Sequence, residues 1–277
     1  MKAVADADLD GLDFTGALSD VRDGMVIAPV WRAYIEQSDS LSVPGVPNRD
    51  LGIRDADGLF HPSSHPTWSE RELYEYLAHP KRLVREQMGY ESRMAVTFGT
   101  IMGAWMASAL VGAGALLPPG PCQFCDPDLL CREASYLDRE TGSFGHVDGE
   151  VDPALTDGVP TLWESKWTQE NTWQGYKRLN EMRDLDNELF AETWPNWAAQ
   201  GLEYMRISGR RRVIYTVGIA GYPWTVREFH LDYDPAAAER VAARYRRVRQ
   251  AYADQRPPEC LCDRNKAKAC VARRLCP

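Results

Sequence analysis

The middle of the chain changes from helical to strand periodicity, and this change limits the possible folds more than any other feature of the sequence. Apolar and polar residues alternate over Phe144–Val151, as in a strand with one buried face. A second strand is predicted over Pro160–Trp167. Two more, Arg212–Gly218 and Trp224–Leu231, follow a stretch with a mainly helical pattern at residues 170–207. The chain is therefore expected to build a sheet from two pairs of strands, with a helical stretch between the pairs.

Helical patterns also lie on both sides of these strands. Ser69-Glu70-Arg71-Glu72 is a capping box that begins a helix, and this helix breaks near His79-Pro80. A further helical stretch runs to about Met88, and Gly99–Leu110 predicts a buried helix whose small residues permit close packing. Ala236–Ala253 predicts the last helix. This order of elements predicts an α/β fold in which a mixed central sheet is flanked by helices.

Composition is that of a globular protein. Of 277 residues, 44% are hydrophobic and 26% are charged, which excludes a wholly disordered chain. Membrane spans need ~20 apolar residues, and the longest candidate, Ile101–Leu117, is shorter and rich in Gly and Ala. The first residues, Met-Lys-Ala-Val-Ala-Asp, carry no apolar signal region. We therefore expect a cytoplasmic protein without membrane contact, in a compartment where disulfides are uncommon.

Charge is distributed unevenly along the chain. Residues 1–60 carry 11 acidic and 5 basic residues, a balance of −6. Residues 239–277 carry 11 basic and 4 acidic residues, a balance of +7. The basic end is typical of a chain with an anionic partner such as a phosphate backbone, or of a solvated helix face followed by a basic terminus. The acidic beginning could dock a protein partner.

Three spaced elements carry groups that phosphodiester hydrolysis needs. The first is Asp148 in the sequence His-Val-Asp-Gly, and the second is the pair Glu164 and Lys166 on the next predicted strand. Residues two apart on a strand point to the same side, so this pair shares one face of the sheet. The third is Gln200 and Tyr204, which are four residues apart and share one helix face.

These residue types suit metal-dependent cleavage of DNA. Carboxylates on neighbouring strands can hold Mg²⁺ or Mn²⁺, hard cations that prefer oxygen ligands. A cation held by Asp148 and Glu164 would polarise a phosphate and lower the pKa of a water. Lys166 could orient that water and stabilise developing negative charge. Gln200 and Tyr204 could hold a DNA end by hydrogen bonds.

Seven cysteines fall into two groups with the spacings C-x2-C-x5-C and C-x-C-x7-C-x5-C. They are Cys122, Cys125 and Cys131 in the first group, and Cys260, Cys262, Cys270 and Cys276 in the second. Thiolates at such spacing can converge on one metal or iron–sulfur cluster, because short loops cost little to close. Buried cysteines without a ligand usually lie in apolar runs, whereas these lie among Pro, Asp, Arg and Lys. Spacing alone does not separate zinc from iron–sulfur.

The three elements, in this order and secondary-structure context, resemble the PD-(D/E)XK nuclease superfamily, specifically its RecB-like exonuclease branch. Asp148 matches the motif-II aspartate of that family. Glu164 and Lys166 match its E-x-K pair, and the Q-x-x-x-Y motif is matched by Gln200 and Tyr204. The resemblance runs from about residue 68 to the C-terminus.

This resemblance implies a restriction-endonuclease-like core and a metal-dependent DNA exonuclease. Members of the branch often act on single strands from the 5′ end, in recombination, DNA processing or phage replication. The stretch Ser69–Lys81 is similar to the opening helix of the family. The basic C-terminal cysteines look like those of the branch with a 4Fe–4S cluster, which includes CRISPR-associated nucleases and phage-encoded relatives. A phage-encoded protein of this kind would work in the host cytoplasm.

The sequence does not decide which residues would ligate the predicted cluster. The family has a Cys-Pro pair at the end of its opening helix, where this chain has His79-Pro80. His79 is either a ligand or a partly exposed histidine at a helix end. The four C-terminal cysteines could complete a 4Fe–4S cluster alone, with Zn²⁺ as the alternative metal. The first cysteine group could supply a missing sulfur or form a separate zinc site.

A second departure concerns the catalytic metal. The family often has Gly-Thr-x-x-His on its first core helix, with the histidine as a metal ligand. Here Gly99-Thr100 is followed by Gly103 at the histidine position. His146 or Glu150, predicted on the same strand face as Asp148, could substitute, and His146 could equally be a hydrogen-bonded strand histidine.

The sequence predicts three regions, and it favours one function over two alternatives. Residues 1–66 predict an acidic irregular lead-in, residues 67–256 a PD-(D/E)XK nuclease domain with a cysteine loop at 118–131, and residues 257–277 a metal-binding or cluster-binding tail. The leading function is a Mg²⁺- or Mn²⁺-dependent exonuclease on single-stranded DNA or free DNA ends. The alternatives are a DNA-binding recombination-accessory protein with impaired catalysis, and a metal-stabilised interaction module whose acidic N-terminus docks a partner.

Overall fold

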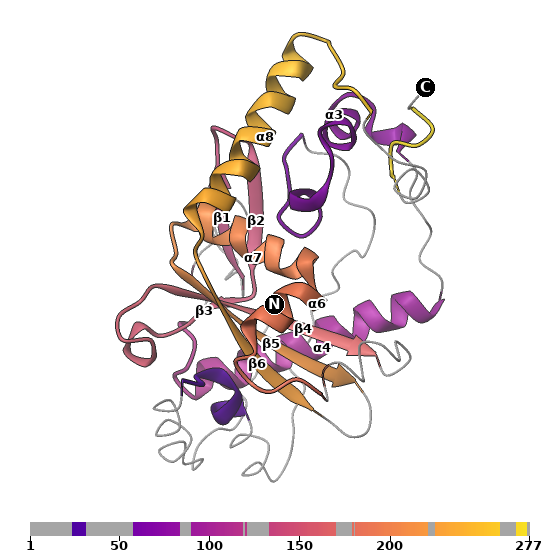
Figure 1. The fold of residues 1–277 in the computed structure, drawn as a ribbon. Helices are drawn as coiled ribbons and strands as arrows, with labels where there is room; N and C mark the ends of the chain where they lie inside the picture. The colour runs from indigo at the N-terminus through magenta and orange to yellow at the C-terminus, as the bar shows by residue number, and fades with distance from the viewer. Residues whose placement is uncertain are drawn as a thin grey trace.

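The fold is known from a computed structural model, which describes most of the chain from residue 58 onward and one earlier segment (Figure 1). The described residues are 24–31, 58–83, 90–118, 120, 133–169, 179, 181–220, 225–260 and 270–275, with only the backbone described for 90–97. Within them, no helix is long and apolar enough to cross a membrane.

A mixed four-stranded sheet forms the centre, in the order β3-β4-β5-β6. The strands are β3 (Gly149–Glu150), β4 (Thr161–Gln169), β5 (Arg212–Ala220) and β6 (Val226–Asp232). β4 and β5 are parallel, and the other two pairings are antiparallel. The predicted α/β fold with a mixed sheet flanked by helices is therefore confirmed.

Helices cover the two faces of this sheet, because side chains alternate along the strands. On one face, Trp163 and Ile214 pack with helix α4 (Tyr90–Gly112) and with residues 27–31. On the other, Leu162 and Tyr215 pack with α6 (Asn187–Thr193) and α7 (Pro195–Ser208). Any side chain on β4 therefore faces either α4 or α7.

A two-stranded hairpin stands beside the main sheet and was not predicted. It consists of β1 (Ala134–Asp138) and β2 (Ser143–Val147), paired antiparallel. The alternating stretch that predicted one strand is thus two strands: β2 pairs with β1, and β3 pairs with β4. Asp148 lies at the junction, where the chain passes from one sheet to the other.

The remaining helices build a third core at the end of the molecule that carries α8 (Figure 1). Helix α3 (Glu70–Ala78) begins with the predicted capping box, in which Ser69 N donates to Glu72 Oε2 at 2.9 Å. α8 (Pro235–Ala253) packs against α3, and Tyr245 and Val248 lie fully buried between them. Three short 3-10 helices, η2 (His65–Thr67), η3 (Pro80–Arg82) and η4 (Pro153–Leu155), complete the described elements. Residues 84–89, part of the helical stretch predicted to reach Met88, lie outside them.

Parts of the predicted irregular lead-in contribute to the cores. Ile27 and Val30 are fully buried, and so is Phe60. The carboxylate of Glu228 on β6 accepts hydrogen bonds from the backbone N–H groups of residues 26, 27 and 28 at 2.6–2.7 Å. Segment 24–31 is therefore attached to the sheet, and the rest of residues 1–57 lies outside the described residues.

Candidate active site

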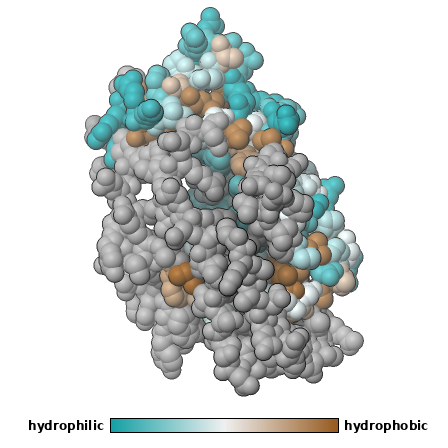
Figure 2. Space-filling view, turned by 180° about the vertical axis from the view of Figure 1, so that it is seen from behind, coloured by the Kyte–Doolittle hydropathy of each residue, from teal (hydrophilic) through white to brown (hydrophobic). Residues whose placement is uncertain are grey.

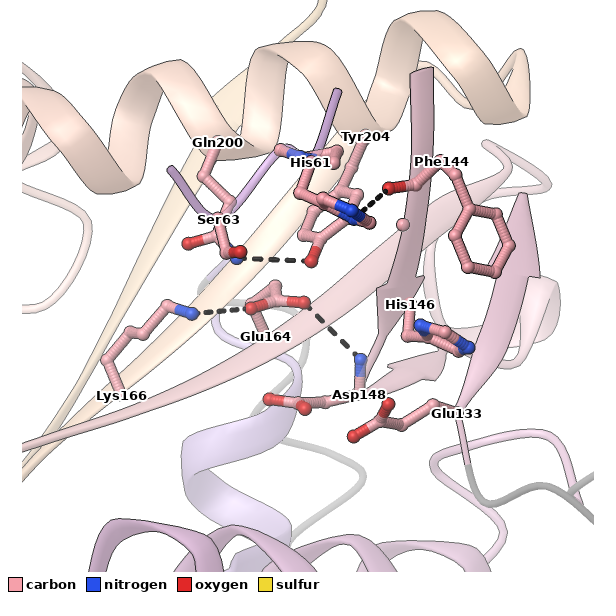
Figure 3. Close-up of a pocket in the computed structure, with 12 residues that line it drawn as sticks. His61, Ser63, Glu133, Phe144, His146, Asp148, Glu164, Lys166, Gln200 and Tyr204 are labelled. Atoms are coloured by element: carbon pink, nitrogen blue, oxygen red, sulfur yellow. Dashed lines mark hydrogen bonds and ion pairs between the residues drawn. The ribbon is translucent and has the colours of Figure 1, made fainter. Parts of the chain in front are cut away.

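One pocket brings together all five residues that the sequence analysis singled out for catalysis and DNA binding (Figure 3). They are Asp148, Glu164, Lys166, Gln200 and Tyr204. The pocket has a volume of about 160 Å³ and lies between the α7 side of the sheet, the hairpin and residues 61–63. Five groups from three sequence regions thus face one small space.

Strand β4 supplies a carboxylate and an ammonium side by side. Lys166 Nζ donates to Glu164 Oε2 at 2.7 Å, and the Glu164 side chain is 3% exposed. Burial, with the negative charge of Asp148 adding to it, raises the pKa of Glu164 to about 8 despite the opposing charge of Lys166. Burial favours the neutral amine of Lys166, but the carboxylates of Glu164 and Asp148 outweigh it and raise the pKa of Lys166. The negative charge of Asp148 acts to raise both pKa values, and a cation bound in the pocket would offset that charge.

Asp148 is tied to β4 at the strand junction. Its Oδ2 accepts from the backbone N–H of Ser165 at 2.8 Å, and its own N–H donates to Glu164 Oε1 at 3.3 Å. These two contacts fix Asp148 next to Glu164 across adjacent chain segments. The two carboxylates offer only oxygen atoms as ligands, which fits a hard divalent cation such as Mg²⁺ or Mn²⁺.

Helix α7 covers the pocket with Gln200 and Tyr204. Gln200 Nε2 donates to the Tyr204 hydroxyl at 3.2 Å, and both side chains are buried. Burial, and then the charge of Glu164, raises the pKa of Tyr204 well above its usual range, so the hydroxyl keeps its proton. Gly145 of β2 allows this packing, because a Cβ there would lie 2.6 Å from Tyr204 Cε1 and 2.9 Å from Pro62.

Glu133, His61 and Ser63 also line the pocket, and the sequence analysis did not select them. His61 Nδ1 contacts the carbonyl oxygen of Phe144 at 3.1 Å, which orients its ring. Glu133 lies directly before β1. It could have been predicted as a pocket residue only if the sequence had predicted the β1–β2 hairpin. His61 precedes the predicted opening helix and carries no spacing signal.

The two predicted substitutes for the missing family histidine have different surroundings. His146 lines the pocket and packs edge-on against the ring of Phe144, with centroids 4.8 Å apart. Glu150 does not line it: its Oε2 accepts from Arg210 at 2.6 Å, and its Oε1 accepts from the Tyr136 hydroxyl. Because the chain changes sheets at Asp148, these residues do not share one continuous strand face as predicted.

Gly103 lies on the other side of the sheet. A Cβ at this position would contact Ser165, at 3.7 Å from its Oγ. Since Ser165 stands between Glu164 and Lys166 on β4, its side chain points to the α4 face. A side chain at position 103, which matches the family histidine, would therefore begin on the sheet face opposite the pocket.

The two described cysteines belong to the C-terminal group. Cys270 is buried in the core of α3 and α8, and Cys260 is half-buried. Arg71 donates to the carbonyl oxygens of Pro258 and Leu275 at 3.1 and 3.0 Å, so both parts of the described tail lie against α3. Cys122, Cys125, Cys131, Cys262 and Cys276 lie outside the described residues, and the predicted ligand partition stays a prediction.

His79 and two arginines of α8 form ion pairs with glutamates. His79 Nδ1 lies 2.7 Å from Glu75 Oε2, as a partly exposed histidine at the helix end. Arg246 and Arg247 pair with Glu140 and Glu70 at 2.9 and 2.6 Å. Both arginines stay partly exposed, and the far end of α8 presents a hydrophilic surface (Figure 2).

Comparison with known proteins gives only distant structural similarity. No family model and no curated protein sequence matches the chain. The solved structures that match include LHK-Exo in complex with dAMP, with 13% identity, a TM-score of 0.47, and coverage of 72% of this chain and 90% of the other. A second structure of this alkaline exonuclease, from Laribacter hongkongensis, matches with 14% identity and a TM-score of 0.43, covering 72% and 89%. SSO0001 matches with 12% identity and a TM-score of 0.41, covering 92% and 98%.

Proposed function

We propose that this protein is a Mg²⁺- or Mn²⁺-dependent DNA exonuclease that hydrolyses phosphodiester bonds at single-stranded or free DNA ends. One observation carries the proposal: Asp148, Glu164, Lys166, Gln200 and Tyr204 line a single pocket and are joined there by hydrogen bonds. Recombination, DNA processing or phage replication would supply such ends.

Asp148 and Glu164 would hold the cation. When bound, the cation supplies Lewis-acid polarisation of the phosphate and lowers the pKa of a water. The backbone N–H of Ser165 keeps Asp148 in place, and burial of Glu164 excludes competing water. These two residues therefore form a rigid set of oxygen donors before DNA arrives.

Lys166 would act on the phosphate rather than on the cation. Its ammonium lies 2.7 Å from Glu164 and is held at the pocket by that carboxylate. From this position it can donate to a phosphate oxygen and stabilise the negative charge that grows during hydrolysis. Gln200 and the protonated hydroxyl of Tyr204 would donate hydrogen bonds to the strand end.

We expect Lys166→Ala to keep cation binding and to lose most cleavage activity. The ammonium stabilises the transition state but offers no lone pair to a cation, and loss of one such donor typically costs about 10²–10³ in rate. Mn²⁺ titration calorimetry and single-turnover cleavage check the two parts. Loss of Mn²⁺ binding in this variant would contradict the assigned role.

The C-terminal cysteines would hold a mainly structural 4Fe–4S cluster, or Zn²⁺ as the alternative. The described tail lies on α3, and its buried cysteine contacts the α3–α8 core. Binding free energy at such sites is largely folding free energy. The cluster would then fasten the tail to the helix that begins the nuclease domain.

We expect Cys270→Ala to lower stability and solubility before it changes chemistry at Asp148. A loss of 1 kcal/mol or more would lower the unfolding midpoint by about 2–4 °C or more for a chain of this size. Thermal unfolding and metal analysis after anaerobic purification check this. Stoichiometric zinc without iron would replace the iron–sulfur assignment, and a folded tail without either metal would refute it.

Cleavage of linear and circular single-stranded DNA tests the proposed function. With Mg²⁺ or Mn²⁺, the wild-type protein should degrade end-labelled linear DNA and leave covalently closed circles intact, because an exonuclease needs an end. Excess EDTA should stop the reaction. Binding of linear DNA without cleavage under any of these conditions would instead favour the accessory DNA-binding protein.

A further inference from the structure

The pocket contains a third carboxylate, Glu133, at the open end of the β1–β2 hairpin. The hairpin register pairs Ala134 with Val147. Glu133 directly precedes Ala134 and Asp148 directly follows Val147, so both residues flank this last pair of the hairpin. The two carboxylates therefore start from the same end of the hairpin.

The side chain of Glu133 points to the pocket. Glu133 lines the same cavity as Asp148 and Glu164, and its carboxylate lies toward that of Asp148 (Figure 3). Lys166 is the one lysine or arginine among the residues that line this cavity. The described pocket thus holds three carboxylates against one ammonium, a balance that favours a divalent cation over a further anion.

Two of the other candidate positions for a third ligand are less suitable. Gly103 has no side chain and starts on the α4 face, next to Ser165. Glu150 is neutralised by Arg210 and hydrogen-bonded to Tyr136, outside the cavity lining.

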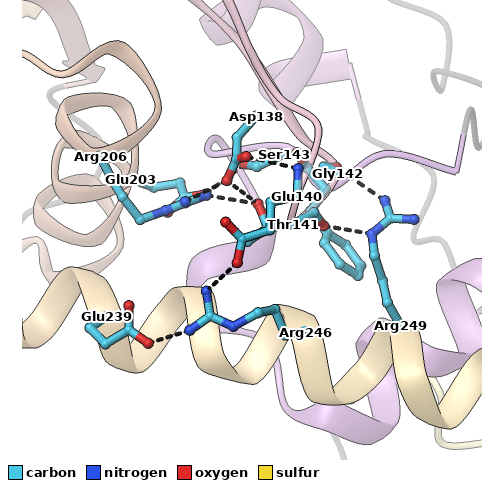
Figure 4. Close-up of polar contacts among 11 residues, drawn as sticks. Asp138, Glu140, Thr141, Gly142, Ser143, Glu203, Arg206, Glu239, Arg246 and Arg249 are labelled. Atoms are coloured by element: carbon cyan, nitrogen blue, oxygen red, sulfur yellow. Dashed lines mark hydrogen bonds and ion pairs between the residues drawn. The ribbon is translucent and has the colours of Figure 1, made fainter.

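The hairpin holds Glu133 firmly enough for this role. At its closed end, Arg206 donates to Asp138 Oδ2 at 2.6 Å, and Arg249 donates to the carbonyl oxygen of Thr141 at 2.6 Å (Figure 4). The closed end of the hairpin therefore has fixed neighbours. Among the described residues, no three acidic, imidazole or thiol side chains are already gathered as a ligand set. Like charges repel one another until a cation lies between them.

We propose that Glu133 is the third carboxylate ligand of the catalytic cation. This inference rests on the proposed function and adds a residue to its site. The ligand set Glu133, Asp148 and Glu164 would then come from the hairpin and from β4, with none from α4.

Mn²⁺ binding to the full-length protein tests this assignment apart from activity. Glu133→Gln keeps the size of the side chain and removes its charge. Loss of an outer-shell partner already costs 10–100-fold in metal affinity, so we expect the Kd for Mn²⁺ to rise at least about tenfold. Glu140→Gln, at the closed end of the same hairpin, should bind Mn²⁺ as the wild type does. Glu133→Ala, with the same expected result, serves if Glu133→Gln does not fold.

The outcomes separate this inference from the proposed function. If Asp148→Asn abolishes Mn²⁺ binding but Glu133→Gln binds as tightly as the wild type, the assignment of Glu133 is wrong and the metal site stands. If the wild type does not bind Mn²⁺, or Asp148→Asn binds it unchanged, both are wrong. An equal loss in Glu133→Gln and Glu140→Gln would mean that hairpin charge in general matters, and would also overturn the assignment.

Discussion

Asp148→Ala and Glu164→Ala should each abolish cation-dependent cleavage while DNA binding persists. Each substitution removes one of the carboxylates that hold the cation, and a cation supplies several kcal/mol of transition-state stabilisation. At 1.36 kcal/mol per tenfold change, the rate should fall by at least about 10³-fold. DNA affinity should persist because Gln200, Tyr204 and Lys166 remain. Single-turnover cleavage and fluorescence anisotropy on the same labelled oligonucleotide measure both quantities.

Glu192→Ala is the matched control for these variants. Glu192 is an exposed residue of α6 and does not line the pocket. The Glu192→Ala substitution removes the same charge from the protein and should leave the cleavage rate unchanged. Near-wild-type cleavage by purified Asp148→Ala or Glu164→Ala would refute the proposed site.

Arg206→Met should destabilise the whole domain far more than Arg246→Met does. Arg206 is a residue of α7, and its guanidinium contacts Glu203 of the same helix at 2.8 Å and Asp138 of the hairpin at 2.6 Å (Figure 4). The Glu203 side chain is fully buried. Removal of one partner from a buried pair leaves an uncompensated charge and costs about 3–5 kcal/mol. The same loss would release the hairpin that carries Asp148.

Chemical denaturation of Arg206→Met and Arg246→Met measures this effect. Arg246 pairs with Glu140 and Glu239, whose side chains are 69% and 66% exposed. Such exposed pairs contribute about 0–1 kcal/mol, so Arg246→Met should unfold close to the wild type. Equal free energies of unfolding for the two variants would show that the buried network does not hold the hairpin.

Local patterns were sufficient to predict the main sheet and the pairing of groups on it. Glu164 and Lys166 share a face because strand geometry has a period of two. The structure places Lys166 Nζ 2.7 Å from Glu164 Oε2. Gln200 and Tyr204 share a face because they are one helical turn apart. The capping box at Ser69 begins α3 as predicted, since its hydrogen bonds are local.

Features that depend on distant contacts were not predictable in this way. β1 has no strong alternation, and all five of its residues are partly buried, so its strand is defined by pairing with β2. The junction at Asp148 depends on two different partner strands, which a local pattern cannot distinguish. Glu133 reaches the pocket only because β1 pairs with β2. The lead-in segment 24–31 joins the core through Glu228, some 200 residues away.

We propose that one pocket, built by β4, the hairpin and α7, holds the cation used to cleave DNA. Anomalous diffraction from wild-type crystals soaked in Mn²⁺ would locate this cation. We expect a manganese peak within ligand distance of the Asp148 and Glu164 carboxylates, on the Lys166 side of β4. If the protein cleaves DNA with Mn²⁺ but the manganese peak lies elsewhere, the proposed cation site is wrong.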